Sequence, residues 1–211
     1  LYNFMPRPMT QSELVTITGT SNPQPLDGEG NNVPTPDIIA AYEEGDLRKD
    51  ASIGYITLST SLREDKVFPY IKKFAKTHAQ HNNHGMNFPI YRYAEVLLFL
   101  AEALNEQGKT AEAATYLNQV RERAGLSPTL ASAQSDLREA IFNERRVELA
   151  FENKRCFDIT RTDRVQEIIG AFGARAIANP LDYYYPDGYG FRPNAYTNIT
   201  KYYTLPAAEA E

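Results

Sequence analysis

The stretch from residue 89 to residue 125 constrains the fold most, because its apolar residues recur at the spacing of an α-helix. Between Pro89 and Gln107 one helix face is marked by Tyr93, Val96, Leu97, Leu100, Ala101 and Leu104. From Thr110 to Ala124 a second face is marked by Ala113, Tyr116, Leu117 and Val120. Pro89 suits a first helical turn, and Gly108 and Gly125 stand where helices end. Because only two or three residues connect the predicted helices, we expect them to pack antiparallel.

Small residues mark the contact between these two helices. Ala101 and Ala113 lie twelve residues apart, with Gly108 at the turn between them. This spacing is typical of a tetratricopeptide-type hairpin, in which alanines let two helices approach closely. A single hairpin cannot bury its apolar face alone. We therefore expect a third helix, from about Ser135 or Asp136 to Asn153, to pack on it, with further helices from sequence outside this chain.

The other segments predict short elements between loops. A short helix should follow Pro36, residues 51–59 and 67–74 should form a β-hairpin, and residues 165–172 a weaker helix. Irregular structure is expected where Pro, Gly, Asn or Tyr are dense, at 1–36, 78–89 and 179–196. The expected fold is mainly α: a tetratricopeptide-like helical hairpin scaffold with long irregular loops and a few short β-strands.

Length and composition narrow the choice of class. The chain has 211 residues, and we expect one domain over 1–211. Its parts are a loop-rich segment (1–88), a helical core (89–172) and a Tyr-rich loop with the C-terminal segment (173–211). The net charge is −5 and no run is rich in Lys or Arg, which excludes a typical nucleic-acid binder. The one cysteine excludes an internal disulfide, and no apolar run is long enough to span a membrane.

Residues 144–161 carry an unusual density of charge. Glu144 falls on the apolar stripe of the third helix, where a carboxylate is costly unless it is paired. We interpret the segment as a buried Glu–Arg network, with the candidate partners Arg121, Arg123, Arg145 and Arg155. The alternative is that Glu144 and Glu148 act as acid and base or hold a metal. No histidine lies near them and no second acidic pair completes a di-metal set, so we favour the network.

Several segments together resemble the C-terminal part of the SusD/RagB family of outer-membrane glycan-binding lipoproteins. They are PTPDIIAAYEEGDLRKDASI (34–53), FPIYRYAEVLLFLAEALNEQG (88–108), AATYLNQVRERAGL (113–126), LREAIFNERRVELAFENKRCFDITR (137–161) and KYYTLPAAEAE (201–211). Their order and joint presence are far more specific than a lone helical repeat, and the resemblance covers most of the chain from about residue 34.

The resemblance implies a tetratricopeptide-like scaffold with irregular loops that carry the ligand site, and a full-length protein of more than twice this length. It implies a protein on the outer face of the outer membrane, held by an N-terminal lipid anchor. Such proteins cap a TonB-dependent (SusC-like) transporter and pass it oligosaccharides, peptides or other nutrients; they are not enzymes and need no cofactor. The anchor and the N-terminal repeats of the family are not in this chain, and LPAAEAE resembles a shortened form of the family's ending. We therefore expect a C-terminal piece.

Candidate ligand residues are offered from chemistry alone, because the ligand loops vary within the family. Carbohydrate binding uses flat aromatic faces against the apolar side of a pyranose and polar groups for its hydroxyls. The candidates are Tyr2, Phe4 and Arg7 near the N-terminus, and Tyr183, Tyr184, Tyr185, Tyr189 and Phe191, followed by Arg192, in the Tyr-rich loop. The alternative interpretation is that these aromatics pin loops onto the helices.

No other pattern predicts chemistry. His78, His81 and His84 do not share one helical face, so we expect a solvated loop and no metal site. Phosphate-loop and nucleophile-elbow motifs are absent. Besides a glycan-binding protein, two classes stay open: a helical-repeat adaptor or peptide-binding family member, and a helical glycoside hydrolase, which would need two carboxylates in an open cleft.

Overall fold

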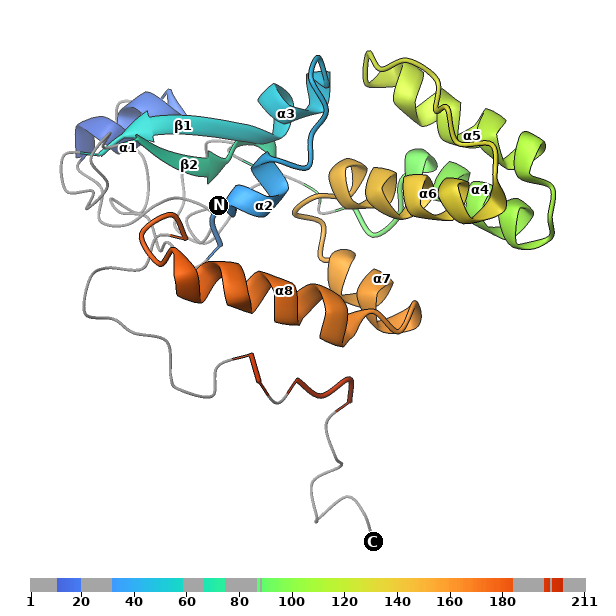
Figure 1. Cartoon of the computed structure of the whole chain (residues 1–211). Coiled ribbons are helices and arrows are strands. Elements are labelled where there is room, and N and C mark those ends of the chain that lie inside the picture. Colours follow the sequence, from blue (N-terminus) through green and yellow to red (C-terminus); the bar gives the residue numbers. More distant parts are fainter. Residues whose placement is uncertain are drawn as a thin grey trace, which may run out of the picture. The chain divides into compact units, whose positions relative to one another are not determined.

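The computed structural model describes residues 11–19, 32–58, 67–74, 87, 89–183, 196–197 and 199–202. The chain divides into two compact units, Leu1–Asn153 and Lys154–Glu211, and each is described by itself. Helices dominate the described residues (Figure 1), which confirms the predicted mainly α fold. The expected organisation as a single domain stays a prediction.

The predicted helix pair is present at the centre of the first unit. Helix α4 spans Tyr93–Glu106 and helix α5 spans Thr110–Arg123. Gly108 and Gly125, just past their ends, have φ angles of +77° and +80°. Only glycine adopts this left-handed conformation without strain, so these two residues end the helices as expected. Helix α4 begins four residues later than predicted, because Pro89 lies in the irregular segment before it.

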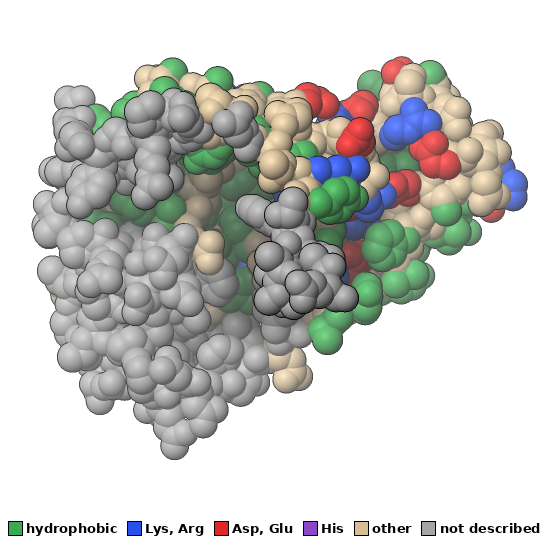
Figure 2. Space-filling model, turned by 90° about the horizontal axis from the view of Figure 1, so that it is seen from below, with side chains coloured by type: hydrophobic (Ala, Val, Ile, Leu, Met, Phe, Trp, Pro, Cys, Tyr) green, Lys and Arg blue, Asp and Glu red, His purple; other side chains and the backbone are tan. Residues whose placement is uncertain are grey.

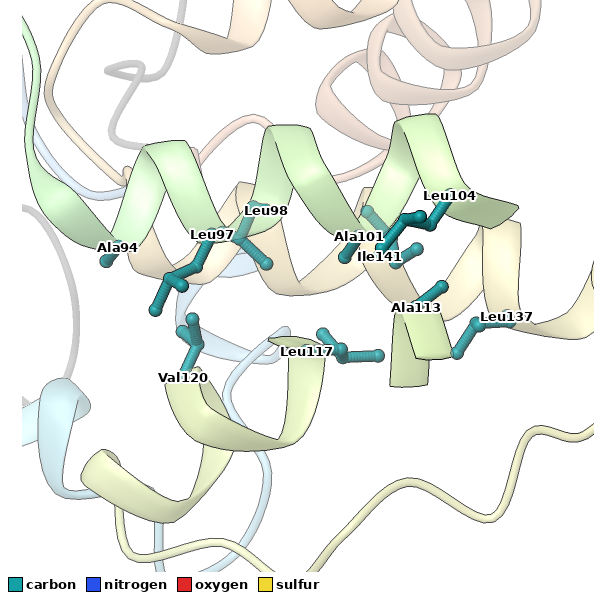
Figure 3. Close-up of a cluster of buried hydrophobic side chains, with 10 residues drawn as sticks. All are labelled: Ala94, Leu97, Leu98, Ala101, Leu104, Ala113, Leu117, Val120, Leu137 and Ile141. Carbon is teal, nitrogen blue, oxygen red and sulfur yellow. The ribbon is translucent and has the colours of Figure 1, made fainter. Parts of the chain in front are cut away.

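A core of aliphatic side chains joins α4, α5 and the following helix α6, Gln134–Glu148. Figure 3 shows its members: Ala94, Leu97, Leu98, Ala101, Leu104, Ala113, Leu117, Val120, Leu137 and Ile141. The side chains of α4 point toward Leu117 and Val120 of α5. Full burial of a leucine contributes about 1.5–3 kcal/mol, so this cluster holds the three helices together.

The predicted apolar face of α4 was partly wrong. Leu97, Ala101 and Leu104 are buried as expected, but the face turns toward Leu98 rather than Leu100. The residues that remain exposed are Tyr93, Val96 and Leu100. Both sets satisfy helical spacing, because α4 is apolar around most of its circumference. The apolar periodicity therefore predicted a helix correctly but did not determine which of its sides faces the core.

Helix α6 ends at Glu148, five residues earlier than predicted. Phe151 and Asn153 have positive φ angles of 68° and 59°, which no helix continues through. The carbonyl of Glu148 accepts hydrogen bonds from Arg92 Nη2 (2.9 Å) and Lys73 Nζ (3.3 Å). These two cations satisfy carbonyls that the next helical turn would have bonded, so the chain can leave the helix here.

The N-terminal part of the first unit contains short elements around one hairpin (Figure 1). They are α1 (Gln11–Thr18), α2 (Pro36–Ile39), α3 (Leu47–Ser52), β1 (Ile53–Thr57), β2 (Val67–Ile71) and the 3₁₀ turn η2 (Lys72–Phe74). Strands β1 and β2 pair antiparallel with Ile53 opposite Ile71 and Thr57 opposite Val67, which confirms the predicted hairpin.

Two helices here were not predicted. Helix α1 lies in the segment 1–36 that was expected to be irregular, so that expectation was wrong for Gln11–Thr18. Helix α3 precedes β1, and the carboxylate of Asp46 accepts from the backbone N–H of Arg48 (2.9 Å) at its start. An aspartate at this position satisfies an otherwise unbonded donor of the first turn, which explains why so short a helix forms.

The second unit contains α7 (Arg155–Arg161) and α8 (Val165–Ala178). The weak helix predicted for 165–172 is present and continues six residues further, to Ala178. Gly170 and Gly173 lowered the helical signal in the sequence, and both nevertheless lie inside α8.

Candidate functional site

Most of the predicted ligand residues lie outside the described part of the chain. These are Tyr2, Phe4, Arg7, Tyr184, Tyr185, Tyr189 and Phe191, together with Arg192. Tyr183 is described: its side chain lies just after α8 and is only 9% exposed. Its proposed contact with a ligand stays a prediction, while its burial matches the alternative interpretation of a residue that pins a loop.

Phe172 on α8 contacts the two residues that flank the Tyr-rich segment 184–195. Its ring meets Tyr183 edge-on at 5.4 Å between centroids and meets Tyr196 edge-on at 5.7 Å. Such edge-to-face pairs contribute about 0.5–1.5 kcal/mol each beyond the area they bury. A Cβ at Gly173 would overlap the side chain of Tyr196, so this glycine is what lets Tyr196 approach the helix. Both flanks of 184–195 are therefore fixed to one aromatic side chain.

Three carboxylates at successive turns form a buried charge network in the first unit. They are Glu144 and Glu148 on α6 and Glu152 just after it, and all three are buried. Glu144 accepts hydrogen bonds from Arg48 (2.6 Å) and Arg121 (3.1 Å). The network therefore links α6 to α3 and α5.

Glu148 contacts more cations than either of the other two carboxylates. Its carboxylate accepts from Arg48 (3.0 Å), Arg92 (2.8 Å) and Arg123 (2.6 Å). Glu152 accepts from Arg92 (2.9 Å) and from Lys73. The interpretation of a buried Glu–Arg network is thus confirmed, with α6 joined to five cations from elsewhere in the unit.

The predicted partners were only half right. Arg121 and Arg123 belong to the network, but Arg145 pairs with Glu95 at 3.6 Å and lies 4.5 Å from the ring centroid of Phe99. Arg155 belongs to the second unit. The partners that sequence reasoning missed are Arg48, Arg92 and Lys73, and no local spacing connects them to α6.

Burial and charge pairing oppose each other in the pKa values of this network. Burial alone would raise the pKa of Glu148, but the hydrogen bonds from Arg92 and Arg48 outweigh it and hold the pKa below its usual value. At Glu144 burial outweighs Arg48 and Arg121, and the pKa is raised. The alternative of an acid–base pair gains no support, because both carboxylates are already bonded to arginines.

A stripe of apolar side chains is exposed along α4 and the residues before it. We call it the α4 apolar stripe: Ile90, Tyr91, Tyr93, Val96, Phe99 and Leu100. Tyr93 is 74% exposed and Tyr91 is 70% exposed. Figure 2 shows apolar side chains beside charged ones on one face of the molecule. A helix that is apolar on two sides is typically covered on both, so this stripe is a candidate contact surface.

The described residues contain neither a metal-binding cluster nor a membrane-spanning helix. Across the described ranges, no group of three or more His, Cys, Asp or Glu side chains is placed to hold a metal ion. His78, His81 and His84 lie outside these ranges. Among the helices that the structure describes, none combines the length and hydrophobicity needed to cross a bilayer.

The described elements and the network define a mainly helical scaffold, and comparison with known proteins places the chain in a family. The sequence profile of the SusD family matches residues 57–211. SusD-like protein P2 of Formosa agariphila is 33% identical over 174 residues, which cover 69% of this chain and 34% of that protein. The chain therefore belongs to the SusD family, and the resemblance seen in its motifs is confirmed.

Solved structures agree with this assignment. A SusD homologue from Bacteroides thetaiotaomicron has a TM-score of 0.53 and 33% identity, covering 62% of this chain and 29% of that one. A SusD-like carbohydrate binding protein from Bacteroides vulgatus has a TM-score of 0.50 and 27% identity, covering 61% and 27%. The chain spans about a third of the length of the curated relatives it matches.

Proposed function

We propose that this chain is part of a cell-surface protein that binds polysaccharides or oligosaccharides and works with a TonB-dependent transporter in nutrient uptake. The observation that carries the proposal is membership of the SusD family over residues 57–211. A structure 27% identical to this chain is described as a carbohydrate binding protein, which supports the same ligand class.

The described residues support separate roles for the helical scaffold, which gives mechanical support, and for the Tyr-rich loop, which would contact the ligand. The aliphatic core and the charge network make the first unit a rigid support. In the second unit, Phe172 fixes Tyr183 and Tyr196 at the two flanks of the Tyr-rich segment. Tyr183 then anchors the loop, while Tyr184, Tyr185, Tyr189 and Phe191 are the proposed sugar-stacking residues. Anchored aromatics bind at a lower cost in conformational entropy than freely mobile ones.

Binding without catalysis is part of the proposal. Glycoside hydrolysis needs one carboxylic acid that donates a proton and one free carboxylate. Glu144, Glu148 and Glu152 instead hold arginines or lysine in place. Release of reducing ends from a polysaccharide that this protein binds would contradict this part.

The transporter partner and the lipid anchor are proposed from family membership. We expect the full-length gene product to fractionate with the outer membrane and to co-purify with a TonB-dependent transporter. Recovery of the protein without any such transporter, from membranes in which the transporter is intact, would contradict the partnership.

Glycan binding is tested by native electrophoresis in gels that contain soluble polysaccharides. The chain and the full-length gene product run side by side, with serum albumin as the unbound reference. Retardation by one or a few polymers is the expected result. Retardation of the full-length product alone would assign the site to residues outside this chain, and free migration of both proteins in every gel would refute glycan binding.

A second candidate function is contact with a protein partner, and the α4 apolar stripe favours it. Six large apolar side chains exposed within eleven residues would gain about 25 cal/mol for each Å² that a partner covers. A photo-crosslinking residue at Tyr93, expressed in cells, should yield an adduct with another protein. The same residue at Glu112, on the polar face of α5, is the control. Adducts of equal yield at both positions would contradict a specific contact.

A further inference from the structure

The first unit contains a cleft of about 550 Å³, and none of the described residues that line it is a predicted ligand residue. This volume is within the range of small-molecule sites in proteins, about 300–1,000 Å³. Three segments form its walls: the turn after α2, the α5 end with the loop that follows it, and α6. Its polar lining includes Glu43, Asp46, Arg121, Ser127, Asn143 and Glu144.

The ionised groups of the cleft are already paired with one another or with Arg48. Glu43 accepts two hydrogen bonds from the guanidinium of Arg121, at 2.6 and 3.0 Å. Asp46 and Glu144 both accept from Arg48, at 2.7 and 2.6 Å. A charged ligand would have to break these bonds to find a counter-ion. The charge pattern therefore favours a neutral ligand.

Neutral side chains supply the hydrogen-bonding capacity that remains. Within the described residues, the hydroxyl of Ser127 and the amide of Asn143 make no hydrogen bond to another residue, and both side chains are exposed. The Thr129 hydroxyl accepts from the backbone N–H of Ala131 (3.2 Å) and keeps its proton to donate. The cleft therefore offers donors and acceptors of the kind that bind sugar hydroxyls.

The rest of the lining is apolar and shallow. Ala41, Ala131, Ala140 and Val147 contribute small side chains, so a flat ring can approach the backbone closely. Leu130 is 98% exposed at the tip of the loop, and an apolar side chain in water is stabilised when a ligand covers it. Neutral hydrogen-bonding groups beside an apolar surface match the two faces of a pyranose.

From these observations we infer that the cleft between the 127–131 loop and α6 is a second carbohydrate subsite, which binds a neutral sugar unit without an aromatic platform. The inference rests on the proposed glycan binding and extends it to a site on the helical scaffold.

The test is a titration of the isotope-labelled chain with neutral methyl glycosides of glucose, galactose, mannose and xylose, followed by amide NMR. At least one glycoside should shift the backbone amides of Ser127 and of residues 129–131, and the side-chain amide of Asn143. The double variant Ser127→Ala/Asn143→Ala should weaken that binding at least about fivefold, since two neutral hydrogen bonds are lost. The matched control is Ser135→Ala, an exposed serine outside the cleft lining. Circular dichroism confirms that each variant is folded.

The outcomes separate this inference from the proposed function. Polysaccharide retardation in the native gel without any glycoside shift at the cleft would overturn the subsite and leave glycan binding intact. Equal affinity of the double variant and the wild type would do the same. Tighter binding of glucosamine or glucuronate than of the neutral glycosides would refute the argument from paired charges. A failure of every carbohydrate in both assays would remove the subsite and the proposed function together.

Discussion

Replacement of Glu148 by glutamine tests whether the buried charge network holds the first unit together. The change keeps the shape of the side chain and removes the charge that three arginines share. The side chain of Glu148 is 2% exposed and that of Arg48 is 9% exposed, so water cannot replace the lost partner. Loss of one member of a buried ion pair costs about 3–5 kcal/mol. For a chain of this size that corresponds to a fall in Tm of roughly 6–20 °C.

Glu106→Gln is the matched control. Glu106 pairs with Arg138 at 2.6 Å, as close as any arginine pair of the network, but both side chains are 47% exposed. Exposed pairs contribute about 0–1 kcal/mol, so this variant should melt within a few degrees of the wild type. The comparison keeps the substitution and the type of partner constant, while burial and the number of arginine partners differ.

Urea unfolding followed by far-UV circular dichroism measures both variants against the wild type. We expect a large loss of unfolding free energy for Glu148→Gln and a small loss for Glu106→Gln. Equal losses in the two variants, or a loss below about 1 kcal/mol at Glu148, would refute the reasoning that the network is structural.

Three further predictions concern packing and pH. In urea titrations, Leu98→Ala should lower the unfolding free energy by about 2–5 kcal/mol and Leu100→Ala by about 1 kcal/mol or less. The reason is that Leu98 faces the core and Leu100 faces solvent. A larger loss for Leu100→Ala than for Leu98→Ala would contradict the face assigned to α4. In thermal melts, Gly170→Ala in α8 should stabilise the fold by about 0.5–1 kcal/mol, whereas Gly173→Ala should destabilise it. Of these two positions, only at Gly173 would a Cβ overlap a neighbouring side chain. Stabilisation by both substitutions would contradict the contact with Tyr196. Because the folded pKa of Glu148 lies below the ordinary 4.5, its stabilisation is present above that value and is lost as pH falls through the folded pKa. In urea titrations at descending pH, the unfolding free energy of Glu148→Gln should therefore fall less on acidification than that of the wild type. The same pH dependence in both proteins would contradict a role for the Glu148 charge in stability.

Local signals predicted the helical scaffold well. Gly108 and Gly125 predicted the ends of α4 and α5 to within one residue, and α5 begins where it was expected, whereas α4 begins four residues later. The rotation of α4 about its axis could not be read in the same way. Exposed Tyr93 and buried Leu97 both fit the helical period, and only packing against α5 and α6 distinguishes them.

The charge network shows the same limit of local reasoning. Glu144 on an apolar stripe predicted a buried ion pair, since an isolated carboxylate there would be costly. Its partner Arg48 lies 96 residues earlier, and Lys73 reaches Glu152 from 79 residues away. Such pairings depend on tertiary structure. The early end of α6 has the same origin, because its last carbonyls are bonded by Lys73 and Arg92.

The amino-acid composition of the Tyr-rich segment indicated a candidate site, whereas the contacts of its residues could not be predicted from the sequence. A run of tyrosines predicted a recognition loop, and the burial of Tyr183 against Phe172 is a contact that the sequence did not indicate. The α4 apolar stripe and the 550 Å³ cleft were also missed. Both depend on which side chains remain exposed after the helices pack, and helical spacing carries no information about that.

Isothermal titration with an oligosaccharide, prepared from a polymer that retards the protein in native gels, tests glycan binding most directly. The full-length gene product and a variant with Tyr184, Tyr185 and Tyr189 changed to alanine are titrated together, and Tyr55→Ala, an exposed tyrosine on β1, is the control. We expect saturable binding that falls at least about tenfold in the triple variant and is unchanged in the control. Absence of binding in the wild type would refute glycan binding by this protein. Equal affinity of the triple variant would contradict the assignment of the site to the Tyr-rich loop.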